Sequence, residues 1–258
     1  MSNLKGLAKD TAIYGLSSIV GRFLNYLLVP LYTAKLSAAS GGYGVITNVY
    51  AYTALLLVIL TYGMETTFFR FANKEGENPQ KVYSTTLMAV GFTSLLFVAL
   101  VLAFIGPISS AMGYAEHPSY VWVMAIAVAL DAFQCIPFAY LRYKKRPIKF
   151  AALKLFNIVL TIALNLVFFL LLPALYENGE NGGFIGNIYS PEVGVGYVFY
   201  INLFCSASLM FLLVKELTGF KYTFDRALMR RMLSYSWPIL VLGIAGILNQ
   251  TADKILFP

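Results

Sequence analysis

The sequence is poor in charge, in histidine and in cysteine. Only 12% of its 258 residues are Asp, Glu, Lys or Arg, against about 25% in soluble domains. So few charges could not cover the core of a soluble fold of this length, which argues against soluble enzymes, nucleic-acid modules and secreted disulfide scaffolds. The two cysteines, Cys135 and Cys205, lie in apolar runs and predict packing residues, with no disulfide framework and no metal site. The single histidine, His117, excludes a catalytic histidine pair.

Long apolar runs dominate what remains. Apolar types make up 59% of the chain, and the mean hydropathy is +0.72. A bilayer core about 30 Å thick needs about 20 apolar residues in a helix. Seven runs reach that length, and they cover residues 11–36, 43–69, 82–106, 120–141, 150–175, 193–214 and 236–257. They are too long for barrel strands and do not alternate in polarity. The sequence therefore predicts an all-α polytopic membrane protein with about seven transmembrane helices.

The loops between these runs separate by charge. One side receives nearly all basic residues, namely Lys5, Lys9, Arg70, Lys74, Lys81, Arg142, Lys144, Lys145, Arg146, Lys149, Lys215, Lys221, Arg226, Arg230 and Arg231. The other side has Lys35 with Glu116, Glu177, Glu180 and Glu192. The positive-inside rule then predicts a cytoplasmic N-terminus and a C-terminus on the outside. The net charge of +7 is thus a topology signal and an attraction to anionic membrane lipids, and indicates no nucleic-acid partner.

Ionisable residues inside the runs are the first candidates for function. A charge at the bilayer centre costs about 2.5–3.5 kcal/mol, so it usually faces protein or water. Arg22 and Asn25 share a polar stripe of the first run, and a guanidinium matches phosphate oxygens. The alternative is a structural arginine bonded to carbonyls or a carboxylate. Asp131, halfway along the fourth run, could pair with Arg22, bind a coupling cation or carry a proton.

Three further groups of polar residues lie within these runs. Lys154, Asn157 and Asn165 recur at spacings of three and four with Thr161, a pattern that suits either substrate contacts or hydrogen bonds between helices. Asn249 and Asp253 share a face of the last run, and Glu65 and Arg70 end the second run. The stretch 224–233 is amphipathic, which predicts a helix lying on the inner leaflet. No phosphate-binding loop, nucleophile elbow or metalloprotease motif is present, so we expect neither an enzyme nor a cofactor.

Three segments carry a family resemblance. Residues 15–32 read GLSSIVGRFLNYLLVPLY, and residues 62–71 read YGMETTFFRF. Residues 236–254 open with Ser-Trp-Pro and close on Asn249-Gln-Thr-Ala-Asp253-Lys254. Together with the basic turn 142–147, these resemble polysaccharide-biosynthesis flippases of the Wzx type. That family shares a superfamily with the multidrug and toxic compound extrusion (MATE) transporters.

The resemblance implies an architecture and a role. The fold would be the N-terminal six-helix lobe of a MATE-like transporter (1–214), a cytoplasmic linker (215–235) and the first helix of a second lobe (236–258), so we expect an incomplete copy of a two-lobe protein. The role would be flipping undecaprenyl-diphosphate-linked oligosaccharide for O-antigen or capsule synthesis, alongside a polysaccharide polymerase and glycosyltransferases. The expected substrate-binding residues are Arg22, Asn25, Lys154, Asn157, Asn165 and Asn249. Asp131 and Asp253 would couple ions, and Glu65 and Arg70 would form a cytoplasmic gate.

Two alternatives stay open at this point. A cation-coupled drug exporter of the same superfamily would centre on Asp131 instead of Arg22. A membrane-embedded glycan polymerase or acyltransferase would need a large external loop carrying Arg or His, and the external loops here are short.

Overall fold

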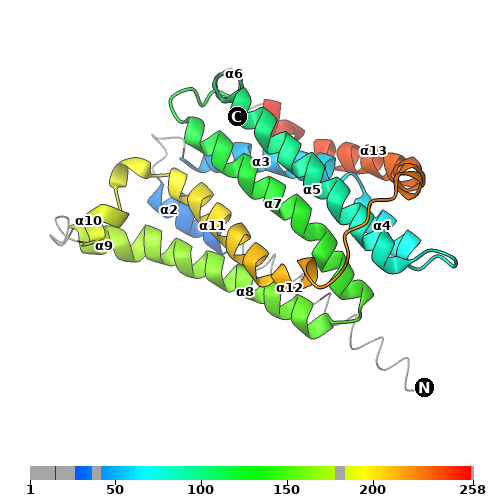
Figure 1. Ribbon diagram of the computed structural model, residues 1–258. Coiled ribbons are helices and arrows are strands. Elements are labelled where there is room, and N and C mark those ends of the chain that lie inside the picture. The colour runs from blue at the N-terminus through cyan, green and yellow to red at the C-terminus, as the bar shows by residue number, and fades with distance from the viewer. Residues whose placement is uncertain (1–14, 16–26, 37–41, 178–183, 257–258) are drawn as a thin grey trace. The chain divides into compact units, whose positions relative to one another are not determined.

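A computed structural model describes residues 15, 27–36, 42–177 and 184–256 (Figure 1). Within these residues the regular elements are all helices and there is no strand, which confirms the predicted all-α class. The chain forms two compact units, Met1–Thr47 with Pro147–Cys205 and Asn48–Arg146 with Ser206–Pro258. These units interleave along the chain and do not follow the expected boundaries after residues 214 and 235. The division into lobes stays a prediction.

The helices keep the order of the predicted runs. The first unit and the segments leading from it contain α2 (Leu28–Lys35), α8 (Pro147–Leu166), the π-helix η2 (Val167–Leu171), α9 (Leu172–Glu177), α10 (Phe184–Ile188), the 3-10 helix η4 (Pro191–Val193) and the start of α11 (Gly196–Leu212). The second contains most of α3 (Gly42–Thr61), then α4 (Met64–Ala72), α5 (Pro79–Ala103), α6 (Ile105–Ala111), α7 (Pro118–Tyr143), the end of α11, α12 (Val214–Leu217) and α13 (Arg226–Leu256).

Five segments of the described chain are long and apolar enough to cross a membrane. They are Gly42–Ala72, Pro79–Ala103, Pro118–Tyr143, Pro147–Glu177 and Arg226–Thr251. Helix α11 is apolar but shorter, and it corresponds to the predicted run 193–214. The predicted run 11–36 falls mostly outside the described residues, and α2 forms its last part. The chain is therefore a multi-pass helical membrane protein.

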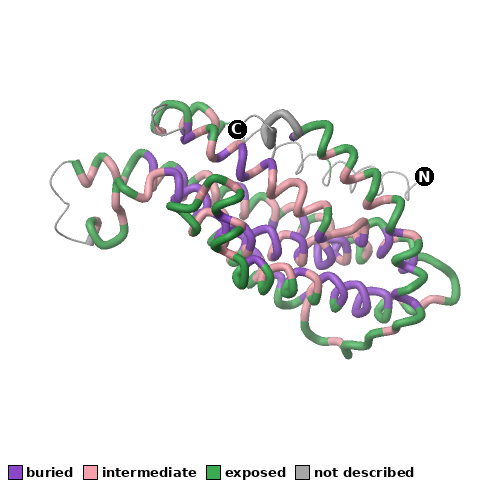
Figure 2. The backbone as a smooth tube through the Cα atoms, turned by 90° about the horizontal axis from the view of Figure 1, so that it is seen from above, coloured by how far each residue is buried: buried purple, intermediate pink, exposed green. Residues whose placement is uncertain are grey.

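Helix α7 is the central helix of the second unit. In its most apolar stretch 67% of the residues are buried, against 28% for α5 and 11% for α13. It packs against α4, α5, α6 and α12, and α5 runs beside it along most of its length (Figure 1). Small residues such as Ala127, Ala132 and Ala139 are buried on α7, and they let neighbouring backbones approach closely. In Figure 2 buried stretches of helix (purple) alternate with exposed stretches (green).

The second predicted run is not one helix, because the chain breaks between α3 and α4. Tyr62 and Gly63 both take positive φ values, 33° and 70°. Gly63 lies directly against α13, since a Cβ added there would meet Ile239 Cβ at 2.9 Å and the carbonyl oxygen of Ser236 at 3.2 Å. Thr67 satisfies the Gly63 carbonyl through both its backbone N–H (3.1 Å) and its hydroxyl (2.9 Å). The close approach of α13 thus explains why glycine stands at this break.

The fifth predicted run also contains an irregular turn. Between α8 and α9 the helix widens to a π-helix, in which the N–H of Leu172 donates to the carbonyl of Val167. Pro173 follows at once, and proline supplies no N–H and crowds the preceding turn of an α-helix. The wider turn accommodates the proline without ending the helix.

The predicted linker and the last predicted span differ most from the structure. Helix α13 begins at Arg226 and passes through residues 235 and 236 without interruption. Leu228 and Met232 are 1% and 0% exposed, because they pack into a core shared by α4, α5, α7 and α13. The amphipathic stretch therefore opens the spanning helix and packs Leu228 and Met232 against protein, instead of forming a separate helix on the leaflet.

The break at Gly63 makes a first prediction. Gly63→Ala should lower the free energy of unfolding by about 2–5 kcal/mol, since the left-handed backbone costs about 1–2 kcal/mol for a residue with a Cβ and the contact with Ile239 adds overpacking of about 1–3 kcal/mol. Gly76→Ala is the matched control, because Gly76 has φ +83° but open space around its Cβ position. Thermal unfolding in detergent, followed by circular dichroism, should show the larger loss at Gly63. Equal losses at both sites would contradict the close approach of α13.

Candidate functional site

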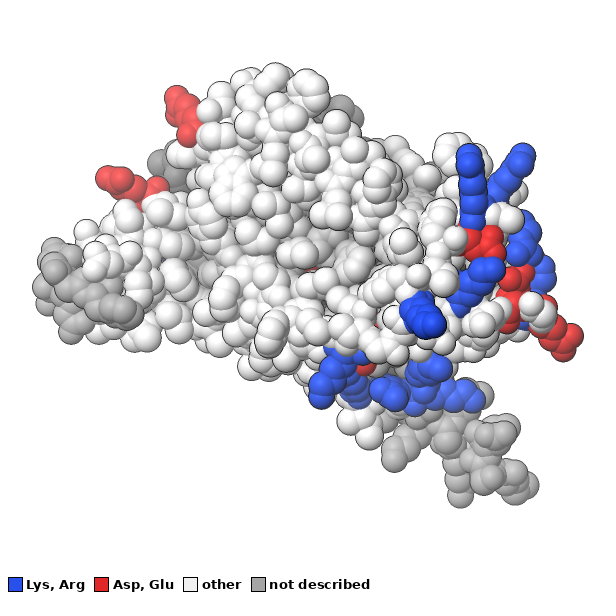
Figure 3. Space-filling view, viewed as in Figure 1, with Lys and Arg blue, Asp and Glu red and all other residues white. Residues whose placement is uncertain are grey.

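One end of the second unit collects basic and aromatic side chains. The end of α4, the start of α5, the end of α7 and the start of α13 meet there, and Figure 3 shows Lys and Arg gathered on this end. Tyr83 and Tyr140 stack at 4.1 Å beneath them, and Phe68 meets Tyr83 edge-on at 5.9 Å. The Arg70 guanidinium lies 4.1 Å from the centre of the Tyr235 ring. This aromatic layer separates the charged end from the apolar helices, as expected of a membrane interface.

The expected gate residues have different partners from one another. Glu65 forms an ion pair with Arg142 of α7, whereas Arg70 stacks on Tyr235 of α13. Two further ion pairs close the same end, Arg231 with Glu77 at 2.6 Å and Lys81 with Asp225 at 2.5 Å. Exposed pairs of this kind contribute about 0–1 kcal/mol each. The charges at this end therefore hold the helices together only weakly, while the gating role itself stays a prediction.

Asp225 joins α5 to α13. Its carboxylate caps α13 by accepting a hydrogen bond from the N–H of Leu228 at 2.9 Å, and its own N–H donates to the Thr85 hydroxyl at 3.2 Å. The hydrogen bond from Lys81, followed by that from the Leu228 N–H, lowers the pKa of Asp225.

Asp131 and Gln134 bind α7 to α11. The Ser206 hydroxyl donates to Asp131 at 2.7 Å, and the Gln134 amide donates to the Ser206 carbonyl at 2.7 Å. Gln134 and Ser206 are 2% and 4% exposed. A carboxylate held at this depth among hydroxyl and amide groups can exchange a proton or attract a cation, which is the expected ion-coupling role. Arg22, its other expected partner, lies outside the described residues.

In the first unit, Asn165 connects α8 to α2. It is 1% exposed, accepts a hydrogen bond from the Tyr32 hydroxyl at 2.7 Å, and donates to the Thr161 carbonyl at 2.8 Å. Phe169 packs edge-on against Tyr32 at 5.7 Å. In this arrangement Asn165 holds two helices together, which was the alternative to a substrate contact.

Asn157, on the polar face of α8, has an unused hydrogen-bond acceptor in the described part of the chain. Its Oδ1 atom is buried and has no hydrogen-bond partner within the described part of the chain. Lys154 lies one turn before it on α8 and is half-buried. A buried carbonyl oxygen without a donor costs free energy unless a ligand or water supplies one. Asn157 is therefore the expected substrate residue that the geometry favours most.

The remaining expected residues are not brought into either cluster. Asn249 is exposed on α13, while the side chain of Asp253 and all of Arg22 and Asn25 lie outside the described residues. Sequence reasoning missed Tyr32 and Ser206 as partners. The only signal for Ser206 was a hydroxyl inside an apolar run, which many helices satisfy with their own carbonyls. No group of three or more His, Cys, Asp or Glu capable of holding a metal occurs among the residues searched, which are the described ones.

The Asp131–Ser206 contact gives a prediction with an internal control. Ser206→Ala should cost about 1–3 kcal/mol of stability, because it removes a hydrogen bond and leaves a carboxyl oxygen of Asp131 without that donor. Ser94 is also buried in a spanning helix, at 4% exposed, but its hydroxyl has no partner within the described chain. Ser94→Ala should therefore be neutral or stabilising in the same thermal unfolding assay. A loss at Ser94 as large as that at Ser206 would show that the Asp131 contact contributes nothing.

The lowered pKa of Asp225 predicts a dependence on pH. A carboxyl whose pKa is lower in the folded state stabilises the fold above its unfolded pKa, and this stabilisation is lost as pH falls through the folded pKa. Asp225→Asn retains a capping oxygen but removes the charge, so it should be less stable than wild type at pH 7 and equally stable at strongly acidic pH. Melting temperatures across this range, with Glu75→Gln as the control, measure the difference. A gap between wild type and Asp225→Asn that is unchanged at acidic pH would refute the ion pair.

Comparison with known proteins identifies one family. The model of the family described as polysaccharide biosynthesis protein matches residues 7–258. No curated protein and no solved structure matches the chain. Because the family match extends over nearly the whole sequence, the chain belongs to the polysaccharide biosynthesis protein family.

Proposed function

We propose that this protein flips undecaprenyl-diphosphate-linked oligosaccharide units from the inner to the outer leaflet of a bacterial cytoplasmic membrane, for O-antigen or capsule synthesis. The observation that carries the proposal is the family match over residues 7–258, in a chain whose described part holds five candidate spans. The Wzx-type and MATE-like relationship, the cytoplasmic N-terminus and the work with a polymerase and glycosyltransferases belong to the same proposal.

The chemistry of the substrate explains the need for a polar path. A diphosphate and a glycan cannot enter hydrocarbon without replacing their water, since each unsatisfied polar group costs several kcal/mol there. Arg22 would pair with the diphosphate, and Asn25, Lys154, Asn157, Asn165 and Asn249 would hydrogen-bond phosphate or sugar. Of these, Asn157 supports the proposal, because its carbonyl oxygen has no partner among the residues that the structure describes, whereas Asn165 would first have to part from Tyr32.

Alternating access would supply the movement. An anionic headgroup that moves outward gains about 2.3 kcal/mol per charge per 100 mV from an inside-negative potential, and Asp131 and Asp253 could add ion coupling. Glu65 and Arg70 lie at the basic end that the proposal places in the cytoplasm. Their interactions with Arg142 and Tyr235 are weak and would break at little cost, although the buried core shared by α4, α5, α7 and α13 lies directly beneath them.

Substitution of Arg22 tests the proposal in cells. Arg22→Ala should abolish glycan export, because the diphosphate loses its cation inside the membrane, while Arg22→Lys should retain part of it, since it keeps the charge but loses the planar fork. Surface polysaccharide is measured by lectin binding, with protein level and melting temperature as controls for folding. Normal export by Arg22→Ala would contradict the role of Arg22. Drug accumulation that responds to Asp131→Asn, with export unchanged, would favour a drug exporter instead.

A further inference from the structure

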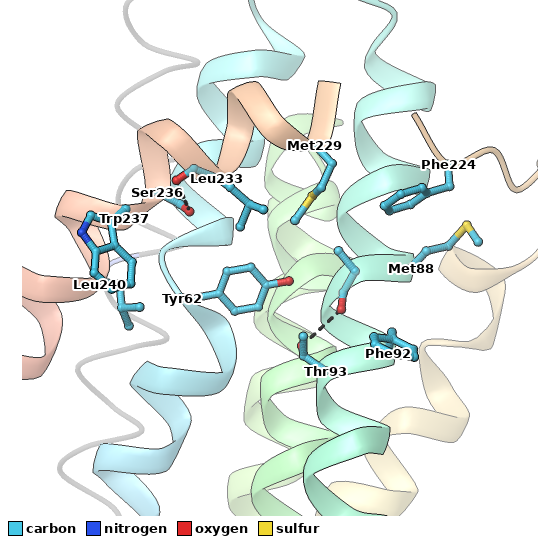
Figure 4. Close-up of a pocket in the computed structure, with 11 residues that line it drawn as sticks. Tyr62, Met88, Phe92, Thr93, Phe224, Met229, Leu233, Ser236, Trp237 and Leu240 are labelled. Atoms are coloured by element: carbon cyan, nitrogen blue, oxygen red, sulfur yellow. Dashed lines mark hydrogen bonds between the residues drawn. The ribbon is translucent and has the colours of Figure 1, made fainter. Parts of the chain in front are cut away.

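An apolar pocket opens beside the break between α3 and α4. Its volume is about 740 Å³, within the range of about 300–1,000 Å³ for ligand sites. Figure 4 shows its lining, which comes from the break, α5, the segment before α13 and α13 itself: Tyr62, Met88, Phe92, Phe224, Leu233 and Trp237. Because α5 and α13 are both candidate spans, this pocket lies where acyl chains of the bilayer would reach it.

A basic groove continues from the same pocket. It shares Phe224, Met229 and Leu233 with the pocket and adds the arginines Arg226, Arg230 and Arg231. Arg231 is occupied by Glu77 at 2.6 Å. Arg226 and Arg230 are exposed, lie one turn apart on the same face of α13, and form no ion pair with any residue that the structure describes.

The local electrostatics favour an anion at this groove. Arg226 and Arg230 lie in the first two turns of α13, whose first turn contains no acidic residue. The start of a helix carries a partial positive charge, so cations are unfavourable there and an anion is favourable. The carboxylate of Asp225, which precedes Arg226 in the chain, is already bound by Lys81 and the Leu228 N–H. Two guanidinium groups are therefore available for a phosphate.

Tyr62 adds a polar group at the apolar end. Its side chain points from the break toward α5 inside the pocket (Figure 4). Its buried hydroxyl lies beside the Thr93 hydroxyl and makes no hydrogen bond of ordinary geometry within the described residues. An ester carbonyl is an acceptor that diacyl lipids carry near the headgroup and that polyprenyl diphosphates lack. This difference selects between the two kinds of anionic lipid.

We propose that the pocket and the basic groove together bind one anionic glycerophospholipid of the membrane. Its phosphate lies on Arg226 and Arg230, its acyl chains fill the pocket beside Phe92 and Trp237, and an ester carbonyl accepts from Tyr62. The site uses only residues of the second unit and is independent of the transport activity proposed above.

Tryptophan fluorescence tests this site directly. The chain has two tryptophans, so Trp122→Phe leaves Trp237 of the pocket as the only reporter. The full chain with this substitution is reconstituted in phosphatidylcholine vesicles that contain increasing fractions of phosphatidylglycerol brominated on its acyl chains. Quenching should saturate, with a midpoint at a several-fold lower mole fraction than for brominated phosphatidylcholine. Arg226→Gln with Arg230→Gln should remove this preference, while the exposed control pair Lys144→Gln with Lys145→Gln should keep it.

Four outcomes would overturn the proposal. Equal midpoints for the two brominated lipids, or quenching that rises in proportion to mole fraction without saturation, would show ordinary contact with surrounding lipid. Undecaprenyl diphosphate at an equimolar amount could relieve the quenching while a tenfold excess of unbrominated phosphatidylglycerol has no effect. That result would assign the pocket to the polyprenyl lipid. Circular dichroism of each variant establishes that the fold is retained, and a preference unchanged in a folded Arg226→Gln, Arg230→Gln variant would also refute the site.

Discussion

Inside hydrocarbon a backbone N–H or carbonyl can bond only to protein, because no water is present to replace a lost partner. This constraint accounts for the helices of the described chain and for the form of their irregularities. At the break between α3 and α4, Thr67 returns two hydrogen bonds to the Gly63 carbonyl. Before Pro173 the helix takes up one extra residue per turn, and the Leu172 N–H still donates to the Val167 carbonyl. Hydroxyls such as those of Thr53 and Thr86 donate to carbonyls of their own helix.

Polar side chains that the backbone does not use can form hydrogen bonds between helices or bind a substrate. Tyr32 with Asn165 and Ser206 with Asp131 form hydrogen bonds between helices, each with a length of 2.7 Å. Asn157 has a buried oxygen with no partner in the described chain, and this oxygen is available to bind a substrate. The basic end differs in kind, since its ion pairs are mostly exposed and individually weak. These weak surface contacts lie over the buried core that α4, α5, α7 and α13 share.

Sequence reasoning predicted the helical class and the positions of four spans, from Gly42–Ala72 to Pro147–Glu177, because hydropathy and length are local properties. It could not predict the break at Tyr62, since an apolar run looks the same whether or not another helix approaches it at a glycine. It treated the stretch 224–233 as a separate helix, because an amphipathic pattern does not reveal whether Leu228 faces lipid or α4 and α5. Partners were the least predictable feature: Glu65 pairs with Arg142, 77 positions away, and Ser206 meets Asp131, 75 positions away. Composition and spacing contain no information about such contacts.

The central claim is movement of a lipid-linked glycan across the bilayer, and reconstitution measures it directly. The full chain is incorporated into sealed vesicles whose inner leaflet carries a polyprenyl-diphosphate oligosaccharide, and an added glycosidase that cannot cross the membrane then reports glycan on the outside. The account predicts that vesicles with protein expose glycan faster than protein-free vesicles, and that an inside-negative potential increases the rate. Glycan that stays protected at the protein-free rate, in vesicles whose protein is folded and inserted, would contradict it.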